Sequence, residues 1–309
     1  MIYDLIIIGA GPAGLSASLT ASYLKLKHIV IEANLGGGAL IQGYPWKKVD
    51  SFLGFWNKTG QEMSDIMMDH VQREGSEIRE KEPVEKIEKN EKSKTFMIHT
   101  TKKEYETKSI LIATGIAGTP RKLGINGEDH KRVHYSIKNP ALYEGHKVLV
   151  VGGGDTAVEA AFALSNAKAD VSIVHRKDVF RCTEKNTACI NKTDAIILFN
   201  TELTEIKAGA ENIESVTLLD NIKSKTKNDK FDDIFIFAGS VISIDYLKDL
   251  DIKMEGNKVV VDNQMKTSID GIYAAGDITG KLMRIPEAIG EGHLAVYSIF
   301  KYLRNPYWA

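Results

Sequence analysis

Two glycine-rich turns in this chain have the residue types and the spacing of dinucleotide-binding turns. The first, Gly9-Ala10-Gly11-Pro12-Ala13-Gly14, is a G-x-G-x-x-G sequence that directly follows an apolar run over 5–8. In such a turn the first glycine permits a tight bend, the second lets the backbone approach a pyrophosphate, and the third lets helix and strand pack closely. The helix after the turn would offer free N–H groups and its positive dipole end to the phosphates.

A carboxylate closes the second strand of this first unit. Glu32 ends the apolar segment 28–32, after the turn and the small-residue helix over 12–24. At that place a carboxylate can accept hydrogen bonds from both hydroxyls of a ribose, and it would repel a 2′-phosphate. A lone G-x-G-x-x-G is a weak signal, but strand, helix and acid together favour a nucleotide site.

The second turn repeats the pattern with alanine in the third place. It comes after the strand expected over 147–151 and precedes another small-residue helix, and its residues are Gly152, Gly153, Gly154, Asp155, Thr156 and Ala157. Alanine is a permitted variant at that position. The sequence therefore predicts a second nucleotide site.

The residues after the second strand of this unit are basic instead of acidic. The strand expected over 170–174 leads directly into His175, Arg176 and Lys177, and Arg181 comes four residues later. Arginine and lysine can pair with a 2′-phosphate, which predicts NADP(H) rather than NAD(H). A solvated basic loop is the alternative interpretation, but the position at the end of a nucleotide-binding strand favours phosphate recognition.

The remaining sequence supplies the elements that position these turns. The strand, glycine turn and helix occur twice, near residue 5 and near residue 148, which predicts an α/β fold with two doubly wound domains. We expect irregular structure over 34–60, a domain-crossing linker over 114–123 and a lysine-rich stretch of short strands over 191–231. Strands are expected over 3–8, 28–32, 84–87, 95–100, 109–113, 147–151, 170–174, 234–237, 258–262 and 271–275, and helices over 12–24, 60–74 and 286–303.

Composition excludes several classes of protein. The 309 residues carry a formal net charge of −1, so no strong field attracts nucleic acid or an anionic membrane. No apolar run approaches the roughly 20 residues that span a bilayer, and no secretory signal is apparent. The two cysteines, Cys182 and Cys189, are too few for a disulfide framework, which predicts a cytoplasmic location. The eight histidines show no metal-binding spacing.

Four signatures together resemble the low-molecular-weight thioredoxin reductase-like flavoproteins, over essentially the whole chain. They are Gly9–Gly14 with Glu32, Ala113-Thr114-Gly115, Gly152–Ala157 with the basic cluster, and Tyr273-Ala274-Ala275-Gly276-Asp277. The resemblance implies a homodimer that binds FAD and NADPH in a three-layer ββα, Rossmann-like architecture. It further implies an FAD domain of 1–115 and 243–309, into which an NADPH domain of 118–240 is inserted.

The resemblance also implies further FAD contacts. Asp277 takes the place of the aspartate that bonds the ribityl or pyrophosphate region, and Val84 falls where the backbone meets the adenine. The family's Gly-Gly-Gln-Leu reads Gly37-Gly38-Ala39-Leu40 here, so Gln42 could supply the flavin hydrogen bond that the missing glutamine makes. The FAD set predicted in this way consists of Gly9, Gly11, Pro12, Ala13, Gly14, Glu32, Gly38, Gln42, Tyr44, Val84, Thr114, Gly115, Asp277 and Ile285.

The dithiol of thioredoxin reductases is absent. The corresponding stretch, 134–140, contains no cysteine, and Ala13 stands where a related bacillithiol disulfide reductase branch has one. Reduction of a substrate disulfide needs a second thiol to resolve the mixed disulfide. Cys182 and Cys189 come after the phosphate-binding cluster, and we interpret them as ordinary free thiols.

A second local match is to the thioredoxin reductase-like ferredoxin/flavodoxin–NADP+ oxidoreductases. The segment from Gly43-Tyr44-Pro45 to Gly54-Phe55 resembles theirs, which implies that Tyr44 stacks on the flavin ring, with simple core packing as the alternative. The C-terminal tail of that branch is longer. Here Tyr307 or Trp308 could serve as a short cover for the flavin, and the favoured alternative is a tail that packs on the surface. Lys47 and Lys48 are candidates for steering an acidic carrier.

We therefore expect an FAD-dependent enzyme that passes hydride between NADPH and FAD and exchanges single electrons with ferredoxin or flavodoxin. Three alternatives stay open. The first is a disulfide reductase that uses Cys182 and Cys189 or an external thiol. The second is a redox-sensing flavoprotein without turnover, and the third is an enzyme that has lost the use of NADPH.

Overall fold

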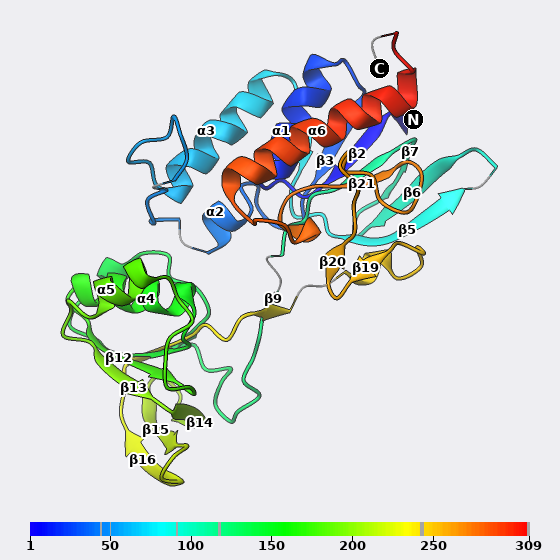
Figure 1. The fold of residues 1–309 in the computed structure, drawn as a ribbon. Helices are drawn as coiled ribbons and strands as arrows, with labels where there is room; N and C mark the ends of the chain where they lie inside the picture. Colours follow the sequence, from blue (N-terminus) through cyan, green and yellow to red (C-terminus); the bar gives the residue numbers. More distant parts are fainter. Residues whose placement is uncertain (44, 50, 91, 117–118, 242–243, 308–309) are drawn as a thin grey trace. The chain divides into compact units, whose positions relative to one another are not determined.

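The computed structural model of the chain describes all residues except 44, 50, 91, 117–118, 242–243 and 308–309 (Figure 1). The chain divides into two compact units. One is formed by Met1–Gly118 together with Ile242–Ala309, and the other by Thr119–Val241. The second unit is thus an insertion in the first, and each is described by itself. Which nucleotide each unit binds stays a prediction.

The first unit is built on a five-stranded parallel sheet. Its order is β21 (Ile272–Ala274), β8 (Ile110–Ile112), β2 (Leu5–Ile8), β3 (His28–Ile31) and β4 (Ile78–Arg79). The strand β2 is buried along its whole length. A continuous apolar run is expected of a parallel strand that is covered on both faces.

The two faces of this sheet pack against different layers. Leu5 and Ile7 share one core cluster with residues of the helices, while Ile6 and Ile8 share another with a second sheet. This alternation results from the two-residue period of a strand. The helices are α1 (Pro12–Tyr23), α2 (Ala39–Gln42), α3 (Gly60–Arg73) and α6 (Ile285–Arg304), and the second sheet has the order β1 (Ile2–Tyr3), β7 (Glu104–Thr107), β6 (Thr95–Thr100) and β5 (Val84–Asn90).

The expectation of one strand over 3–8 is wrong in detail. Two strands, β1 and β2, belong to different sheets and meet at Asp4. The Asp4 carboxylate is buried, accepts the Lys27 N–H and pairs with Lys108 and Arg304. A buried carboxylate needs such partners, and the chain changes sheet where they are available.

Near the C-terminus the strand expected over 258–262 is also shorter than predicted. It consists of β20 (Lys258–Val259), which pairs in an antiparallel hairpin with β19 (Met254–Glu255). The unit is completed by two 3-10 helices, η2 (Asp245–Leu247) and η3 (Asp277–Thr279).

The second unit repeats the layering. Its parallel sheet has the order β10 (Val133–His134), β17 (Asp233–Ile236), β11 (Lys147–Val151), β12 (Asp170–His175) and β13 (Ile196–Phe199). One apolar cluster joins β11, β12 and β17 to an antiparallel sheet of β14 (Thr201–Ala208), β15 (Ile213–Asp220) and β16 (Lys225–Asp229). The helical elements are η1 (Pro140–Tyr143), α4 (Asp155–Asn166) and α5 (Glu184–Ile190).

The two segments that lead into and out of the second unit pair with each other. The short strand β9 (Thr119–Pro120) runs antiparallel to β18 (Ser240–Val241), and the Arg121 N–H donates to the Gly239 carbonyl. The expected α/β fold with two doubly wound units is confirmed. Among the residues that the structure describes, no helix has the length and apolarity needed to cross a membrane.

Candidate functional site

The first glycine turn lies at the carboxyl end of β2, directly before α1. Gly9 has φ of 105°, and a Cβ on it would lie 2.5 Å from the Ala113 carbonyl oxygen. A Cβ on Gly14 would lie 1.9 Å from the Gly9 oxygen. Gly11 is the N-cap of α1 with no side chain capping the helix, and Pro12 occupies the first helical position. The turn therefore requires its glycines and leaves helix N–H groups for a ligand.

Glu32 lies against this turn. The side chain is buried, its Oε2 accepts the Ala10 N–H at 2.8 Å, and its Oε1 accepts the Asn34 N–H at 2.8 Å. Each carboxylate oxygen has a second lone-pair direction available. The acid thus holds the turn in place and retains the acceptors that binding of a ribose would need.

The segment before α2 also packs against the first turn. The Gly37 N–H donates to the Ala10 carbonyl at 2.8 Å, and a Cβ on Gly38 would lie 2.8 Å from the Gly11 Cα. Gln42 is exposed at the end of α2. The predicted stacking residue, Tyr44, lies outside the residues that the structure describes.

Two further segments reach the same end of the sheet. Thr114, which comes after β8 and Ala113, has its Oγ1 3.2 Å from the Tyr246 hydroxyl, and Gly115 has φ of 63°. A Cβ on Gly276 would lie 2.9 Å from the Ala13 Cβ, so the Asp277 motif stands beside α1. Three of the four signatures, far apart in the sequence, therefore meet around the first turn.

Asp277 opens the 3-10 helix η3. Burial, and then the negative charges of Glu287 and Glu291, raise the pKa of its carboxyl group, whereas Arg284 lowers it. A carboxyl group whose charged form is disfavoured in this way gains from any hydrogen-bond donor that a ligand brings.

Glu291 is a residue that the sequence reasoning missed. It is buried in α6, its Oε2 accepts the Gly276 N–H at 2.7 Å, and its Oε1 lies 3.1 Å from the Lys281 Nζ. It therefore fixes the backbone next to Asp277. A lone acid on the apolar side of the helix expected over 286–303 was the signal that could have indicated it.

The last two predicted FAD residues lie at element starts. Val84 begins β5 beside a bulge between Val84 and Lys86, and Ile285 begins α6. Both are half-buried. Their contacts with FAD stay predictions.

The second glycine turn has the same place in the second unit. Gly152 has φ of 147°, and a Cβ on it would lie 2.7 Å from the Phe237 carbonyl oxygen. Gly154 is the N-cap of α4, again without a side-chain cap, and a Cβ there would meet nothing within 4 Å. Ala157 is fully buried behind the turn. The space in front of Gly154 is open to a ligand.

The basic cluster folds back onto this turn. The Arg181 N–H donates to the Gly153 carbonyl at 2.6 Å, and Arg181 forms a parallel bridge with Gly154. The side chains of Arg176, Lys177 and Arg181 are exposed and form no ion pair among the described residues. Three cations, for which the described residues supply no ion pair, thus stand at the edge of the turn, which is the arrangement that a phosphate needs.

His175 lies behind the turn. A Cβ on Gly153 would lie 2.3 Å from the His175 Nδ1, and the ring Nε2 is buried without a hydrogen-bond partner in the structure. Burial, and then the charges of Arg176, Arg181 and Lys177, lower the pKa of the ring. The structure thus shows that His175 packs against Gly153, whereas its contact with a nucleotide stays a prediction.

Asp155 joins the turn to the next helix. Its Oδ1 accepts the Thr183 N–H at 2.8 Å and the Asn186 Nδ2–H at 2.6 Å. Thr156 and Ala157 come next in the first turn of α4. Because Arg181 precedes Thr183 by two residues, this network also fixes the path of the basic cluster.

The cysteines form no disulfide. Cys182 and Cys189 are both free and half-buried, and the Cys182 Sγ lies 3.1 Å from the Thr187 Oγ1. No group of three or more metal-ligating side chains occurs in the described part of the chain.

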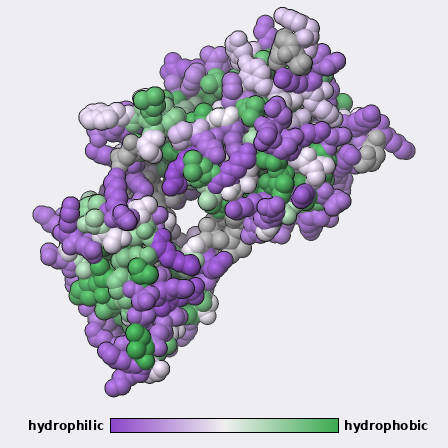
Figure 2. Space-filling model, in the orientation of Figure 1, coloured by the Kyte–Doolittle hydropathy of each residue, from purple (hydrophilic) through white to green (hydrophobic). Residues whose placement is uncertain are grey.

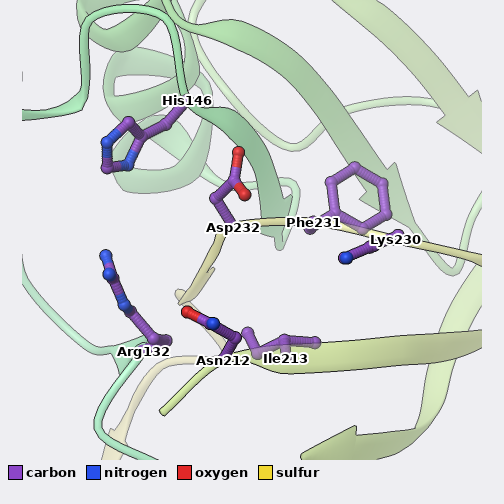
Figure 3. Close-up of a pocket in the computed structure, with 7 residues that line it drawn as sticks. All are labelled: Arg132, His146, Asn212, Ile213, Lys230, Phe231 and Asp232. Carbon is purple, nitrogen blue, oxygen red and sulfur yellow. The ribbon is translucent and has the colours of Figure 1, made fainter.

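A cavity of about 290 Å³ lies in the second unit, at the end of the parallel strands opposite to the glycine turn (Figure 3). It is next to the amino ends of β11 and β17, whereas the glycine turn comes after the carboxyl end of β11. The buried Asp233 beside it accepts hydrogen bonds from His134 and His146 at 2.7 and 2.8 Å. Its lining residues are Arg132, His146, Asn212, Ile213, Lys230, Phe231 and Asp232.

Comparison with known proteins agrees with this geometry. Residues 3–292 match the pyridine nucleotide-disulphide oxidoreductase family. The chain is 36% identical to the ferredoxin–NADP reductase of Ignicoccus hospitalis, over 99% of each chain, and 32% identical to the thioredoxin reductase of Bacillus subtilis, over 98% and 96%. The Lactococcus lactis thioredoxin reductase structure is 30% identical and superposes with a TM-score of 0.89, over 98% of this chain and 100% of that one.

The expected cofactors, FAD and NADPH, are those of this family, and the resemblance to thioredoxin reductase-like flavoproteins is confirmed. The chain belongs to the pyridine nucleotide-disulphide oxidoreductase family.

Proposed function

We propose that this chain transfers hydride between NADPH and FAD and exchanges single electrons with ferredoxin or flavodoxin. The observation that carries the proposal is the pair of glycine turns with opposite charges beside them. Glu32 faces the first turn, while Arg176, Lys177 and Arg181 stand at the second. An acid disfavours a 2′-phosphate and a cationic cluster favours it, so the two turns suit FAD and NADPH respectively.

The residues of the first unit fit FAD. The N–H groups at the start of α1 would bind the pyrophosphate, and Glu32 would accept the hydroxyls of the adenosine ribose. Gly11 and Gly38 approach each other so closely that a side chain on Gly38 would fill the space between them. Gln42, Val84, Thr114, Gly115, Asp277 and Ile285 would complete the site, with Tyr44 against the flavin ring. When bound, FAD accepts hydride from NADPH and can release electrons one at a time.

The residues of the second unit fit NADPH. The open face of Gly154 and the start of α4, with Asp155 and Thr156, would receive the pyrophosphate. Arg176, Lys177 and Arg181 would hold the 2′-phosphate. His175 and Ala157 would support the turn from behind, where both are buried.

The one-electron carrier is supported by two observations. Several relatives bear the name ferredoxin–NADP reductase at 30–36% identity over nearly the whole chain. The segment 134–140, which holds the dithiol in thioredoxin reductases, contains no cysteine. We further propose that the protein is a cytoplasmic homodimer and that Tyr307, which is fully exposed, is a surface residue and not a cover for the flavin. Trp308 lies outside the residues that the structure describes.

Disulfide reduction is the second candidate, because a relative at 32% identity bears the name thioredoxin reductase. It would require Cys182 and Cys189 or an external thiol. If a Cys182→Ser, Cys189→Ser variant keeps its full NADPH-dependent disulfide reduction, this candidate fails for the chain's own thiols.

Anaerobic stopped-flow absorbance of the flavoprotein tests the proposal. We expect fast flavin bleaching by NADPH, slow bleaching by NADH, and rapid reoxidation by ferredoxin or flavodoxin. Reoxidation only by a disulfide or by oxygen would refute the carrier assignment.

A further inference from the structure

The segment between α2 and α3 carries two large apolar side chains that stand almost fully in water. Leu53 is 97% exposed and Trp56 is 88% exposed. Burial of such a side chain in a contact would remove its apolar surface from water, which is favourable. Single exposed apolar residues are ordinary, but apolar residues gathered at one place mark contact sites. Figure 2 shows a largely hydrophilic surface with scattered apolar areas.

A braced turn holds these side chains outward. The Phe55 N–H donates to the Phe52 carbonyl at 3.2 Å, and the two rings stack with centroids 5.0 Å apart and planes 9° apart. Gly54 has φ of 94°, which favours glycine, although a Cβ there would meet nothing within 4 Å. Leu53 therefore sits at the tip of an ordered turn, and we call residues 52–56 the Leu53–Trp56 turn.

The base of the loop is fixed to α3. Lys48 and Thr59 form an antiparallel bridge, and the Val49 N–H donates to the Lys58 carbonyl at 2.8 Å. Thr59 caps α3 in a capping box with Glu62. Figure 1 shows the loop between α2 and α3 extending from the unit. The apolar tip thus rises from a base that backbone pairing joins to the start of α3.

Positive charge lies at the base of the loop that carries the tip. The segment 45–60 contains three lysines and one acidic residue, and one of the lysines, Lys58, pairs with Glu62 in α3. Lys47 and Lys48 are exposed, and the Lys48 Nζ donates to the neutral amide oxygen of Asn57, so its charge is not compensated there. An apolar tip with exposed cations at its base is complementary to an acidic protein whose contact surface has an apolar centre.

We propose that the Leu53–Trp56 turn is the docking surface for the acidic one-electron carrier. This inference rests on the proposed function and names where its partner binds. Transient redox encounters bury less than about 1,200 Å² in total, and stable dimers bury more. One aromatic side chain buries roughly 150–250 Å², so a turn with two anchors suits a transient carrier better than a second copy of the chain.

The test is a Leu53→Ala, Trp56→Ala variant of the FAD-loaded full chain. Its matched control is Tyr23→Ala, Leu142→Ala, which removes two similarly exposed apolar side chains elsewhere. NADPH oxidation is measured with ferricyanide, with a bacterial ferredoxin carrying two [4Fe–4S] clusters, and with a flavodoxin. We expect kcat/KM for the protein carrier to fall about tenfold in the test variant only, as for loss of one interface anchor. The ferricyanide rate should stay at the wild-type value in both variants.

Each other outcome overturns the inference. An unchanged kcat/KM for the carriers would remove the docking role. A change from dimer to monomer in sedimentation of the test variant would make this turn an interface between copies of the chain. If the wild type reduces ferricyanide but neither protein carrier, the proposed function fails and the docking surface fails with it.

Discussion

The two glycine turns of this chain have one backbone design and two chemical surroundings. Both come after a central parallel strand and open a helix whose N-cap is a glycine without a side-chain cap. In the first unit a buried carboxylate accepts an N–H of the turn itself. In the second, a backbone N–H of the basic loop donates to the turn, and the cations remain exposed. In the proposed function, both turns bind phosphate and the residues after the second strand decide which nucleotide fits.

The largest contrast is expected at the third position of each turn. Gly14→Ala would place a Cβ 1.9 Å from the Gly9 oxygen, which cannot be relieved by a side-chain rotation. We expect a loss of about 3 kcal/mol or more in stability, the upper range for overpacking, together with loss of FAD. The reverse change, Ala157→Gly, should cost only about 1 kcal/mol, as for glycine in a helix. Thermal unfolding and the FAD content of the purified variants measure both effects, and equal losses would refute the contrast.

The next contrast concerns the charges. Arg176→Ala, Arg181→Ala should reduce the preference for NADPH over NADH by roughly 100-fold, because hydrogen bonds to charged groups contribute about 1.5–3 kcal/mol each when buried and less when exposed. The activity with NADH should remain. Steady-state kinetics with both coenzymes measure the ratio, and Lys192→Ala, Lys207→Ala removes two exposed cations of the same unit as the control. A parallel fall with both coenzymes would mean that the cluster does not recognise the 2′-phosphate.

Much of this contrast could be predicted from sequence, because it depends on local patterns. The strand β11 has the predicted bounds of 147–151, since an apolar run of four residues directly before Gly152 leaves little choice. The interruption at Asp4 could not be predicted, because it depends on Lys108 and Arg304, which are distant in sequence. Glu291 was missed for the same reason, since its partner Gly276 belongs to another element. Local sequence patterns therefore predict helices and strands, whereas the partners of a buried charge depend on the tertiary structure and cannot be predicted in this way.

A smaller effect is expected at the acid of the first turn. Glu32→Gln leaves one carbonyl oxygen where two carboxylate oxygens accept the Ala10 and Asn34 N–H groups. One buried donor loses its partner, which costs about 1–3 kcal/mol, and FAD should bind roughly tenfold more weakly. Fluorescence titration of the apoprotein with FAD measures this. Glu85→Gln, an exposed acid of the same unit, should leave the affinity unchanged. Unchanged FAD binding by Glu32→Gln would show that the acid serves only the backbone.

The smallest expected effect is on the pH dependence of stability, which one histidine sets in each unit. Burial lowers the pKa of His175 behind the second turn, and burial also lowers the pKa of His28 in the first unit. Each ring is therefore less protonated in the folded chain than in the unfolded chain. The stabilising contribution is present above pH 6.5 and is lost as the pH falls below it, with a slope of at most about 1.4 kcal/mol per pH unit.

Replacement of either ring by glutamine should remove this slope only in its own unit. Hydrogen exchange between pH 5 and 7.5 resolves the two units, because it reports opening segment by segment. His175→Gln should flatten the pH dependence around β11 and α4, and His28→Gln should flatten it around β2 and β3. Loss of the slope in both units from one substitution would contradict the separate origin of the two effects. That result would show that the two units unfold together, because protonation of a histidine in one unit can change hydrogen exchange in the other only if both open in the same step.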